Sequence, residues 1–330
     1  MDPEIMLMND FSDDELVEET HLQEQNLPLV LQPIADLKDA PEWVYKHRMA
    51  LEQKLHRHGA ILFREFNLHS ADDFEQLAGA LCGDLYSEYG DLPGERQSAK
   101  IYGSTPYPAE HPILYHNESS HMGQWPGKIN FFCVTPAQEG GATPIVDCRK
   151  VYQQLHAGIR RRFEDSGVMY IRNFHEGLDV SWQQFFRTDD RRVVEESCRK
   201  DGVTCEWTGD GLRISRRSRA VIHHPATGEA SFFNQVQLHH PCCLPEDTRE
   251  SLLSVFEIED LPRNVCYGDG SPIEDAVMDH VGELYEKNAV RFRWQKGDMA
   301  CLDNMLVAHG RDPYAGARKI LVALGDMVMA

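Results

Sequence analysis

The chain has 330 residues, of which 42% are hydrophobic and 26% charged, a composition that excludes wholesale disorder and is ordinary for a globular protein. It carries 33 basic and 53 acidic residues, a net charge of −20, so DNA, RNA and anionic membranes are not expected as partners, because they bind basic surfaces. Residues 1–30 lack the features of a secretory signal and no apolar run reaches membrane-spanning length, so we expect a cytoplasmic protein.

The chain is expected to begin with an acidic N-terminal arm, residues 1–30, followed by one domain, residues 31–330. The stretch from Asp2 to Glu19 holds eight carboxylates and no lysine or arginine, which is typical of a solvated arm. In the domain, apolar spacing predicts helix over Ala40–His58 and a buried strand over Gly59–Phe63. A second helix is predicted over Ala71–Leu81, with Ser70 as its N-cap.

Beyond residue 128 the pattern becomes richer in β-structure. Strands are predicted at the following places: Ile129–Val134, Thr143–Val146, several short pieces between Val168 and Phe233, Met299–Ala308 and Lys319–Val328. Helices are predicted over Val151–Phe163, Glu246–Phe256 and Ile273–Lys287. Without an internal repeat or low-complexity linker, this order favours one α+β domain in which helices flank a mainly β core.

The segment His116-Asn117-Glu118 is the first candidate metal site. In an extended strand, residues two apart point to the same side, so His116 and Glu118 can present an imidazole and a carboxylate to one ion. With one distant histidine they would form the two-histidine, one-carboxylate triad of non-haem Fe(II) oxygenases. Alone, the H-x-E pattern is a weak signal that occurs often by chance, and a surface histidine and glutamate would be the better interpretation.

Three further features strengthen this interpretation. The run Gly140-Gly141-Ala142-Thr143 places a hydroxyl 27 residues after His116, and an apolar strand near the C-terminus ends in His309. Arg318 lies nine residues beyond His309, at the start of the last predicted strand. A buried arginine is costly unless it meets an anion, and a small dicarboxylate would satisfy it with paired hydrogen bonds.

With these motifs together, the chain resembles the taurine dioxygenase and clavaminate synthase (TauD/TfdA) family of Fe(II)/2-oxoglutarate oxygenases. The resemblance covers residues 59–329 and is most similar to the branch that hydroxylates amino acids for antibiotic and peptide pathways. It rests on these motifs, in order: His116-Asn117-Glu118-Ser119-Ser120, Trp125-Pro126, Gly140 to Ile145 with Asp147, His223-His224-Pro225 with Thr227-Gly228, Phe232-Phe233-Asn234, Asp303-Asn304, His309-Gly310-Arg311 and Arg318.

The resemblance implies a double-stranded β-helix (jelly-roll) core and roles for single residues. His116, Glu118 and His309 would bind the iron, while Arg318 and Thr143 would bind 2-oxoglutarate. Asp303 and Asn304 would support the site, and no catalytic residue is assigned beyond the metal ligands.

The implied reaction uses Fe(II), 2-oxoglutarate and O2, releases succinate and CO2, and hydroxylates an unactivated carbon. Desaturation or ring closure with the same cofactors is the alternative outcome. Related halogenases have a small residue at the carboxylate position, which leaves room for chloride. Because Glu118 fills that space, halogenation is disfavoured.

The expected substrate is a small amino-acid-like molecule, free or carrier-tethered. An acidic chain would repel the acidic carrier proteins of such pathways, which favours a free, cationic substrate. By analogy with relatives, residues 88–104 and 119–123 would flank the pocket. The candidate contacts are Glu88, Tyr102, Ser119 and Arg311, although ordinary loop roles fit each of them equally well.

Two other classes of protein remain open at this point. A zinc-dependent hydrolase could use the same three ligands, but Thr143 and Arg318 would then have no obvious role. A binding module without turnover is the other alternative, and the complete triad argues against it. The run His239-His240-Pro241-Cys242-Cys243 is interpreted as a partly buried loop, because residues so close in sequence cannot all face one ion.

Overall fold

The structure is a computed structural model that describes residues 16–22, 26–86, 100–103, 107–175, 177–178 and 180–329. Its helices are α1 (Ala40–Lys46), α2 (Arg48–His58), α3 (Ala71–Leu81), α4 (Cys148–Gln154), α5 (Ala157–Ser166), α6 (Trp182–Phe186), α7 (Arg191–Lys200), α8 (Val236–His239), α9 (Glu246–Leu253) and α10 (Asp275–Asn288). Two short 3-10 helices follow α8 and α9, namely η2 (Pro241–Cys243) and η3 (Ile258–Asp260).

The largest sheet has seven strands, in the spatial order β1 (Val17–His21), β2 (Leu29–Pro33), β3 (Ala60–Phe63), β15 (Met299–Asp303), β6 (Gln124–Thr135), β18 (Lys319–Met329) and β4 (Tyr102–Gly103). A second, three-stranded sheet is ordered β5 (Ile113–His116), β16 (Val307–Arg311) and β8 (Ile145–Asp147). The third, four-stranded sheet is ordered β10 (Thr204–Thr208), β11 (Gly211–Ser218), β9 (Val168–Phe174) and β14 (Arg263–Tyr267). Two strand pairs complete the set, β12 (Val221–His223) with β13 (Ala230–Phe232), and β7 (Glu139–Gly140) with β17 (Tyr314–Ala315).

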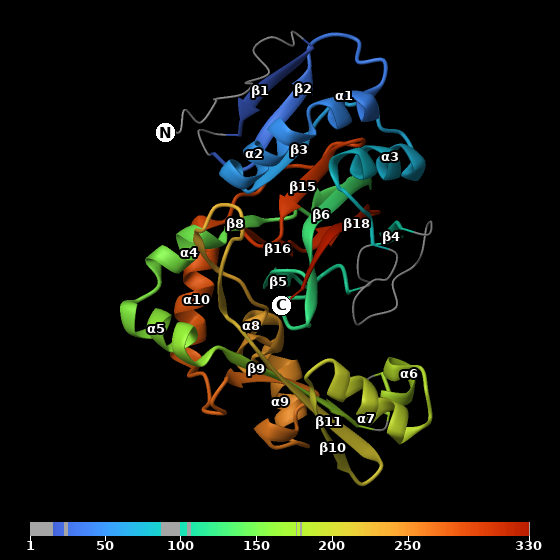
Figure 1. Cartoon of the computed structure of the whole chain (residues 1–330). Helices are drawn as coiled ribbons and strands as arrows, with labels where there is room; N and C mark the ends of the chain where they lie inside the picture. The colour runs from blue at the N-terminus through green and yellow to red at the C-terminus, as the bar shows by residue number, and fades with distance from the viewer. Residues whose placement is uncertain are drawn as a thin grey trace, which may run out of the picture.

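The seven-stranded sheet is apolar on both faces, and different elements pack against each face. Alternate residues such as Leu29, Ile61 and Met299 pack with Val44 and Leu77 of the helical layer formed by α1, α2 and α3. This layer lies beside β2 and β3 at the blue end of the molecule (Figure 1). The parallel pairing of β2 and β3, flanked by helices, gives this region the α/β character expected from its sequence.

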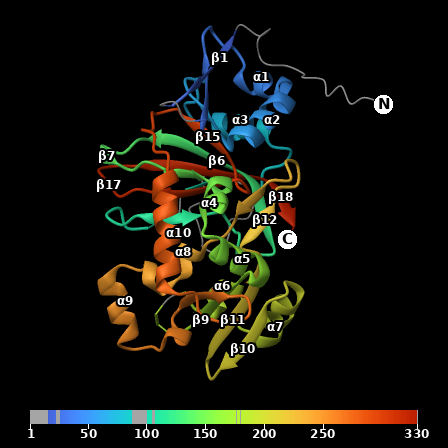
Figure 2. The ribbon, with the colours of Figure 1, turned by 90° about the vertical axis from the view of Figure 1, so that its left-hand side faces the viewer.

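The opposite face of this sheet packs on the three-stranded sheet. Leu62, Ile129 and Leu302 from the large sheet lie in one buried cluster with Ile145 and Val307 from the small one. Two facing, mainly antiparallel sheets form the jelly-roll core, as predicted. Helix α10 runs along one side of this core, with α4 and α5 beside it (Figures 1 and 2).

The four-stranded sheet forms the other end of the molecule, where α6, α7 and α9 surround it (Figure 1). Phe174, Trp182, Val194 and Leu212 make its separate apolar cluster. The sequence analysis predicted only short strands between residues 168 and 233, so it missed α6 and α7. Helix α6 buries Trp182, and α7 buries Val194 and Cys198. So few buried apolar residues give only a weak helical pattern in the sequence.

The predicted boundary between arm and domain, at residue 30, falls inside β2. Leu29 and Leu31 are fully buried, and β1 pairs antiparallel with β2, so residues 17–21 and 29–33 belong to the large sheet. Burial of one apolar face explains why this strand joins the core although acidic residues precede it. Residues 1–15 of the predicted arm lie outside the described residues.

Helix α3 has the predicted Ser70 cap, and the Asp73 side chain accepts the Ser70 N–H in return. Two other predicted elements are each interrupted in the structure. The helix predicted over Ala40–His58 is divided into α1 and α2 at His47. The predicted Met299–Ala308 strand is two strands, β15 and β16, separated by a turn. Within the part of the chain that the structure describes, no helix combines the length and hydropathy needed to cross a bilayer.

Candidate metal centre

Two histidines on neighbouring strands form the base of the site. His116 is the last residue of β5 and lies directly opposite His309 of β16, and their ring centroids are 4.3 Å apart. The Nδ1 atom of His116 is 2.8 Å from the carbonyl oxygen of Leu114, which leaves Nε2 to face the site. Cross-strand pairing therefore brings together two imidazoles that are 193 residues apart, from 116 to 309.

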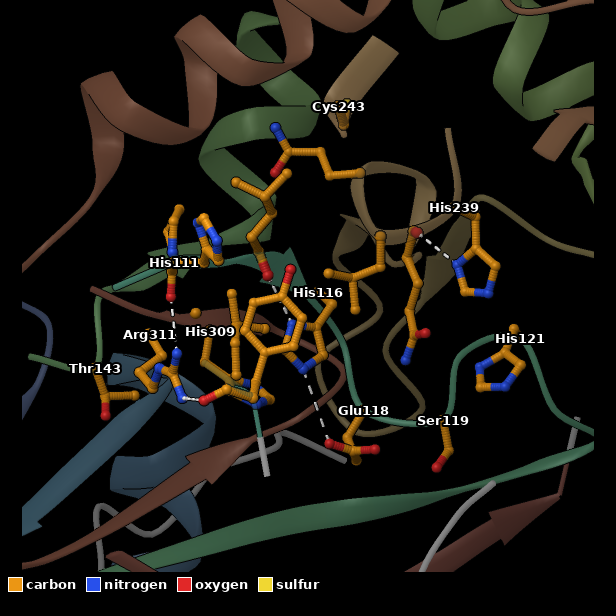
Figure 3. A pocket seen from close by; sticks show the side chains of 18 of the residues that line it. His111, His116, Glu118, Ser119, His121, Thr143, His239, Cys243, His309 and Arg311 are labelled. Atoms are coloured by element: carbon orange, nitrogen blue, oxygen red, sulfur yellow. Dashed lines mark hydrogen bonds and ion pairs between the residues drawn. The ribbon is translucent and has the colours of Figure 1, made fainter. Parts of the chain in front are cut away.

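Glu118 completes the cluster, although it lies outside the strand. Strand β5 ends at His116, so the alternation of side chains along a strand, from which this pairing was predicted, is not what positions Glu118. Asn304 holds its backbone instead: Asn304 Oδ1 accepts from Glu118 N at 2.7 Å, and Nδ2 donates to Glu118 O at 2.9 Å. His116, Glu118 and His309 each offer a ligand atom, all within 4.8 Å of one another (Figure 3).

The turn that carries Asn304 is itself fixed by a buried carboxylate. Asp303 Oδ1 accepts the N–H groups of Met305 and Leu306, while Asp303 Oδ2 lies 3.0 Å from Nε2 of His224. Asp303, His224 and His56 also have ligand atoms within 4.8 Å of one another. Because these bonds already organise the turn, we interpret this second cluster as support for Asn304.

Replacing Asn304 by Ala is expected to weaken Fe(II) binding by about 10- to 100-fold, the usual effect of removing groups that orient a metal ligand. The bidentate amide clamp on Glu118 is lost, whereas both imidazoles stay in place on paired strands. Equilibrium dialysis with Fe(II) measures the change. Asn288→Ala, which also removes an asparagine that bonds a backbone carbonyl, is the control, and equal affinities in the two variants would contradict the role of Asn304.

The electrostatics of the cluster suit a cation. Within the described chain, Glu118 has no lysine or arginine within 4.0 Å, and its nearest charged or ionisable neighbour is His116 Nε2 at 3.9 Å. Burial, reinforced by the adjacent His116, holds the pKa of His309 well below its ordinary value, so the ring is neutral and keeps a lone pair for a metal. The buried Nδ1 of His309 also has no hydrogen-bond partner among the described residues. Two imidazoles and one carboxylate without a lysine or arginine beside it in the described chain fit a divalent metal ion such as Fe(II).

Arg318 and Thr143 meet beside the metal cluster. Arg318 donates through Nε to the carbonyl oxygen of Gly141 at 2.9 Å and through Nη2 to Thr143 Oγ1 at 3.3 Å. Trp294 Nε1 also donates to Thr143 Oγ1, at 3.0 Å. Since this oxygen accepts two bonds, the hydroxyl proton of Thr143 is left to donate to a ligand.

The surroundings of the Arg318 guanidinium favour the binding of an anion. Burial, with a contribution from nearby Arg311, lowers the pKa of Arg318 to about 10. Within the described residues it forms no salt bridge with a carboxylate. A bound carboxylate would compensate the buried charge with charge-assisted hydrogen bonds, so the pair matches the predicted 2-oxoglutarate site.

A cavity of about 630 Å³ opens onto both groups of residues. Its wall includes the metal cluster, Thr143 and Arg318, together with apolar side chains such as Leu114, Phe131 and Val322. The wall also has a part formed by α8 and β14 that was not predicted, which contributes Gln235, Gln237, Leu238 and Arg263. No motif marks these residues, because their position depends on how the four-stranded sheet packs against the core.

The four predicted substrate contacts have different outcomes. Ser119 and Arg311 line the cavity, whereas Tyr102 is buried in β4 and is not part of the wall, so the structure does not support its predicted contact. The guanidinium of Arg311 donates to the carbonyl oxygens of Tyr107 and His111, a loop-holding role. Glu88 lies outside the described residues.

The charges that line the cavity bear on the expected charge of the substrate, which stays a prediction. Among the described residues of the wall, Glu118 is the sole carboxylate, whereas Arg263, Arg311 and Arg318 bring three guanidinium groups. A cationic substrate would meet like charge here, because the overall charge of a chain does not fix the charge of one cavity.

The His239–Cys243 run contributes His239 and Cys243 to the cavity wall and holds two thiols close to a histidine. His240 Nδ1 is 2.9 Å from Cys242 Sγ, and Cys242 Sγ is 3.8 Å from Cys243 Sγ. Hydrogen bonding from Cys243 and then His240 lowers the pKa of Cys242 to about 5, against the effect of burial. His240, Cys242 and Asp275 have possible ligand atoms within 4.8 Å of one another, so only two residues of the run and one from α10 come together, and the run is partly buried as predicted.

Cys242 is expected to react with iodoacetamide at a rate that is already maximal at pH 7 and falls as the pH is lowered through about 5. Its thiolate is the nucleophile and is stabilised by two neighbours, whereas burial raises the pKa of Cys133, Cys148 and Cys198. Mass spectrometry of tryptic peptides follows the labelling, with Cys242→Ser as the control. A Cys242 rate that keeps rising to pH 9 would show an ordinary thiol.

A jelly-roll with two histidines and one glutamate on the wall of a cavity defines the class of non-haem metal-dependent oxygenases. The family model for the taurine catabolism dioxygenases, the TauD/TfdA family, matches residues 28–324. The chain belongs to this family and is an Fe(II)- and 2-oxoglutarate-dependent dioxygenase. This confirms the predicted family, enzyme class and cofactors and leaves the hydrolase and the inactive binding module without support.

Two relatives match most of the chain. The dapdiamide synthesis protein DdaC of Enterobacter agglomerans is 37% identical over 280 residues, which cover 84% of this chain and 85% of DdaC. A clavaminate synthase-like protein of Arabidopsis thaliana is 27% identical over 327 residues, 93% of this chain and 96% of the plant protein.

Solved structures confirm the fold. PvcB from Pseudomonas aeruginosa matches with a TM-score of 0.58 at 12% identity and covers 96% of this chain and 94% of its own. A taurine dioxygenase from Burkholderia xenovorans has a TM-score of 0.55 at 14% identity, with 96% and 95% covered. At such low identity, the likeness concerns the double-stranded β-helix alone.

Proposed function

We propose that this dioxygenase hydroxylates an unactivated carbon of an amino acid, or of a precursor derived from one, in natural-product biosynthesis. The observation that carries the proposal is the arrangement of His116, Glu118 and His309 beside the Arg318–Thr143 pair, on one cavity. The similarity to DdaC, a dapdiamide synthesis protein, supports a biosynthetic role. PvcB, a structural neighbour, is an Fe, α-ketoglutarate dependent oxygenase from an isonitrile synthetic pathway.

In this proposal each group has a distinct task. His116, Glu118 and His309 would hold the iron, which would supply the oxidising chemistry together with 2-oxoglutarate and O2. Arg318 would bind a carboxylate of 2-oxoglutarate, and the Thr143 hydroxyl beside it would donate to the same group.

The rest of the cavity controls the substrate. Leu114, Phe131 and Val322 make an apolar wall that limits the access of water and positions the carbon to be attacked. Asn304 keeps the Glu118 backbone fixed while ligands exchange. The chain therefore contributes geometry, a dry pocket and orientation.

Desaturation or ring closure remains the alternative outcome of the same chemistry, since it needs the same cofactors. Whether the substrate is free or carrier-tethered also stays a prediction, as does the cytoplasmic location. Product mass distinguishes the outcomes, because hydroxylation adds one oxygen atom and desaturation removes two hydrogen atoms.

A screen for succinate tests the proposal. Iron-loaded enzyme is incubated with 2-oxoglutarate and O2 and with each candidate amino acid or short peptide, and succinate is measured against a mixture without substrate. At least one amino-acid-type compound is expected to raise succinate release stoichiometrically with product. Stimulation by non-amino-acid compounds alone would contradict the proposed substrate class and leave the dioxygenase intact.

A further inference from the structure

The wall of the cavity formed by α8 and β14 contains two polar groups that the cofactors do not use. Arg263 is the first residue of β14, and Gln237 is on α8, and these two elements pack against each other. Both side chains line the cavity that also contains the metal cluster. Their chemistry is complementary, since a guanidinium binds anions and an amide oxygen accepts N–H bonds.

Gln237 is buried with an unsatisfied acceptor. Its side chain is 7% exposed, and Oε1 has no hydrogen-bond partner among the described residues. A buried carbonyl oxygen without a partner costs free energy, so such groups are rare in folded proteins unless a ligand completes them. An ammonium or amide N–H of a ligand in the cavity would supply the missing donor.

Arg263 has no carboxylate within salt-bridge distance among the described residues and donates no hydrogen bond to them. It also lies directly opposite Arg172 of β9 in the antiparallel register, so the two side chains share one face of the sheet. Arg263 is the member of this pair that lines the cavity, since the Arg172 guanidinium lies over the rings of Phe174 and Phe185. A bound carboxylate would supply the anionic partner that Arg263 lacks among the described residues.

We propose that Arg263 and Gln237 form the subsite for an amino-acid head group, in which Arg263 binds the carboxylate and Gln237 Oε1 accepts from the amino or amide nitrogen. This inference rests on the proposed function and specifies how the substrate class is recognised. The apolar wall and the metal cluster then receive the remainder of the molecule. Arg318 stays reserved for the co-substrate, since Thr143 and Gly141 fix it on another part of the wall.

The test compares each amino acid that stimulates succinate release with its carboxamide, using enzyme loaded with Fe(II) and 2-oxoglutarate without O2. Binding is followed through the change in the visible absorption of the chelate. Wild-type enzyme should bind the acid about 10- to 100-fold more tightly than the amide, the range expected for a charged hydrogen bond. Arg263→Ala should bring this ratio close to one, and Arg263→Lys should restore part of it.

Arg213→Ala is the matched control. Arg213 lies on β11 of the same sheet, and the alternation of the register places its side chain on the face opposite to that of Arg263. This variant should keep the wild-type ratio. Retention of the full acid-to-amide ratio in Arg263→Ala would overturn the assignment of Arg263.

A second comparison tests Gln237 through ligand preference, which does not depend on the stability of the variant protein. Gln237→Met keeps the length of the side chain and removes the acceptor, so the preference for the amino acid over its desamino analogue should fall by about 5- to 20-fold. An unchanged preference would overturn the role of Gln237. If the chelate forms but binds none of the acids, the head-group site and the substrate class both fail. If an amino acid is turned over and Arg263→Ala leaves its KM unchanged, the head-group site alone fails.

Discussion

Glu118→Gln is expected to raise the dissociation constant for Fe(II) at least about 100-fold and to abolish succinate formation, since loss of a ligand exceeds the 10- to 100-fold effect of its supporting groups. The substitution keeps the shape of the side chain and, among the described residues, removes the one carboxylate of the cluster with the two imidazoles. The fold should be kept, because Asn304 holds the backbone of residue 118 and not its side chain.

The Glu118→Gln variant should also differ from wild type in how its melting temperature responds to iron. In metal-free protein the half-buried Glu118 carboxylate has no cationic side chain beside it in the described chain, so its removal should leave the melting temperature unchanged or higher. Added Fe(II) should raise the melting temperature of wild type and not that of Glu118→Gln. Glu274→Gln, which breaks a surface pair with Arg162, is the control and should behave as wild type. Wild-type iron affinity in Glu118→Gln would remove this residue from the metal site.

Arg318→Ala is expected to raise the 2-oxoglutarate concentration needed for half-maximal rate by at least about 30-fold, because truncating one member of a buried charge pair costs about 2–5 kcal/mol. Iron affinity should change by less than about threefold, since no atom of Arg318 belongs to the metal cluster. The variant also leaves the Thr143 hydroxyl with one fewer donor.

Two measurements separate these effects, namely the KM for 2-oxoglutarate and the Fe(II) dissociation constant of the apoenzyme. Arg318→Lys should recover part of the loss, because an ammonium keeps the charge but not the paired geometry. Arg162→Ala, an arginine with a surface ion pair, should change neither quantity. Equal losses of iron and 2-oxoglutarate binding would mean that Arg318 supports the fold of the whole site.

The residues of the metal and 2-oxoglutarate sites were the most predictable part of the molecule, because they lie in short motifs. His116, Glu118, Thr143, His309 and Arg318 were all predicted, and the structure brings them to one cavity. The reason given for the His116–Glu118 pair was wrong in one respect. A strand was expected to align them, whereas the strand ends at His116 and a distant amide positions Glu118. Spacing along a sequence cannot reveal such a contact between residues 118 and 304.

The substrate wall was not predictable for a related reason. Arg263 and Gln237 come from β14 and α8, whose position depends on packing between the four-stranded sheet and the core, and neither residue lies in a motif. The net charge of −20 favoured a cationic substrate, yet the cavity gathers guanidinium groups. A global charge averages over the surface, whereas recognition depends on the few groups that face the ligand.

The most direct test of the account is the visible spectrum of the protein mixed with Fe(II) and 2-oxoglutarate without O2. If His116, Glu118 and His309 hold the iron with room beside it for a chelating keto acid, a weak charge-transfer band appears, and it requires all three components. It should be lost in Glu118→Gln and should need more 2-oxoglutarate in Arg318→Ala. A folded protein that binds Fe(II) and 2-oxoglutarate but shows no such band would contradict the proposed metal centre.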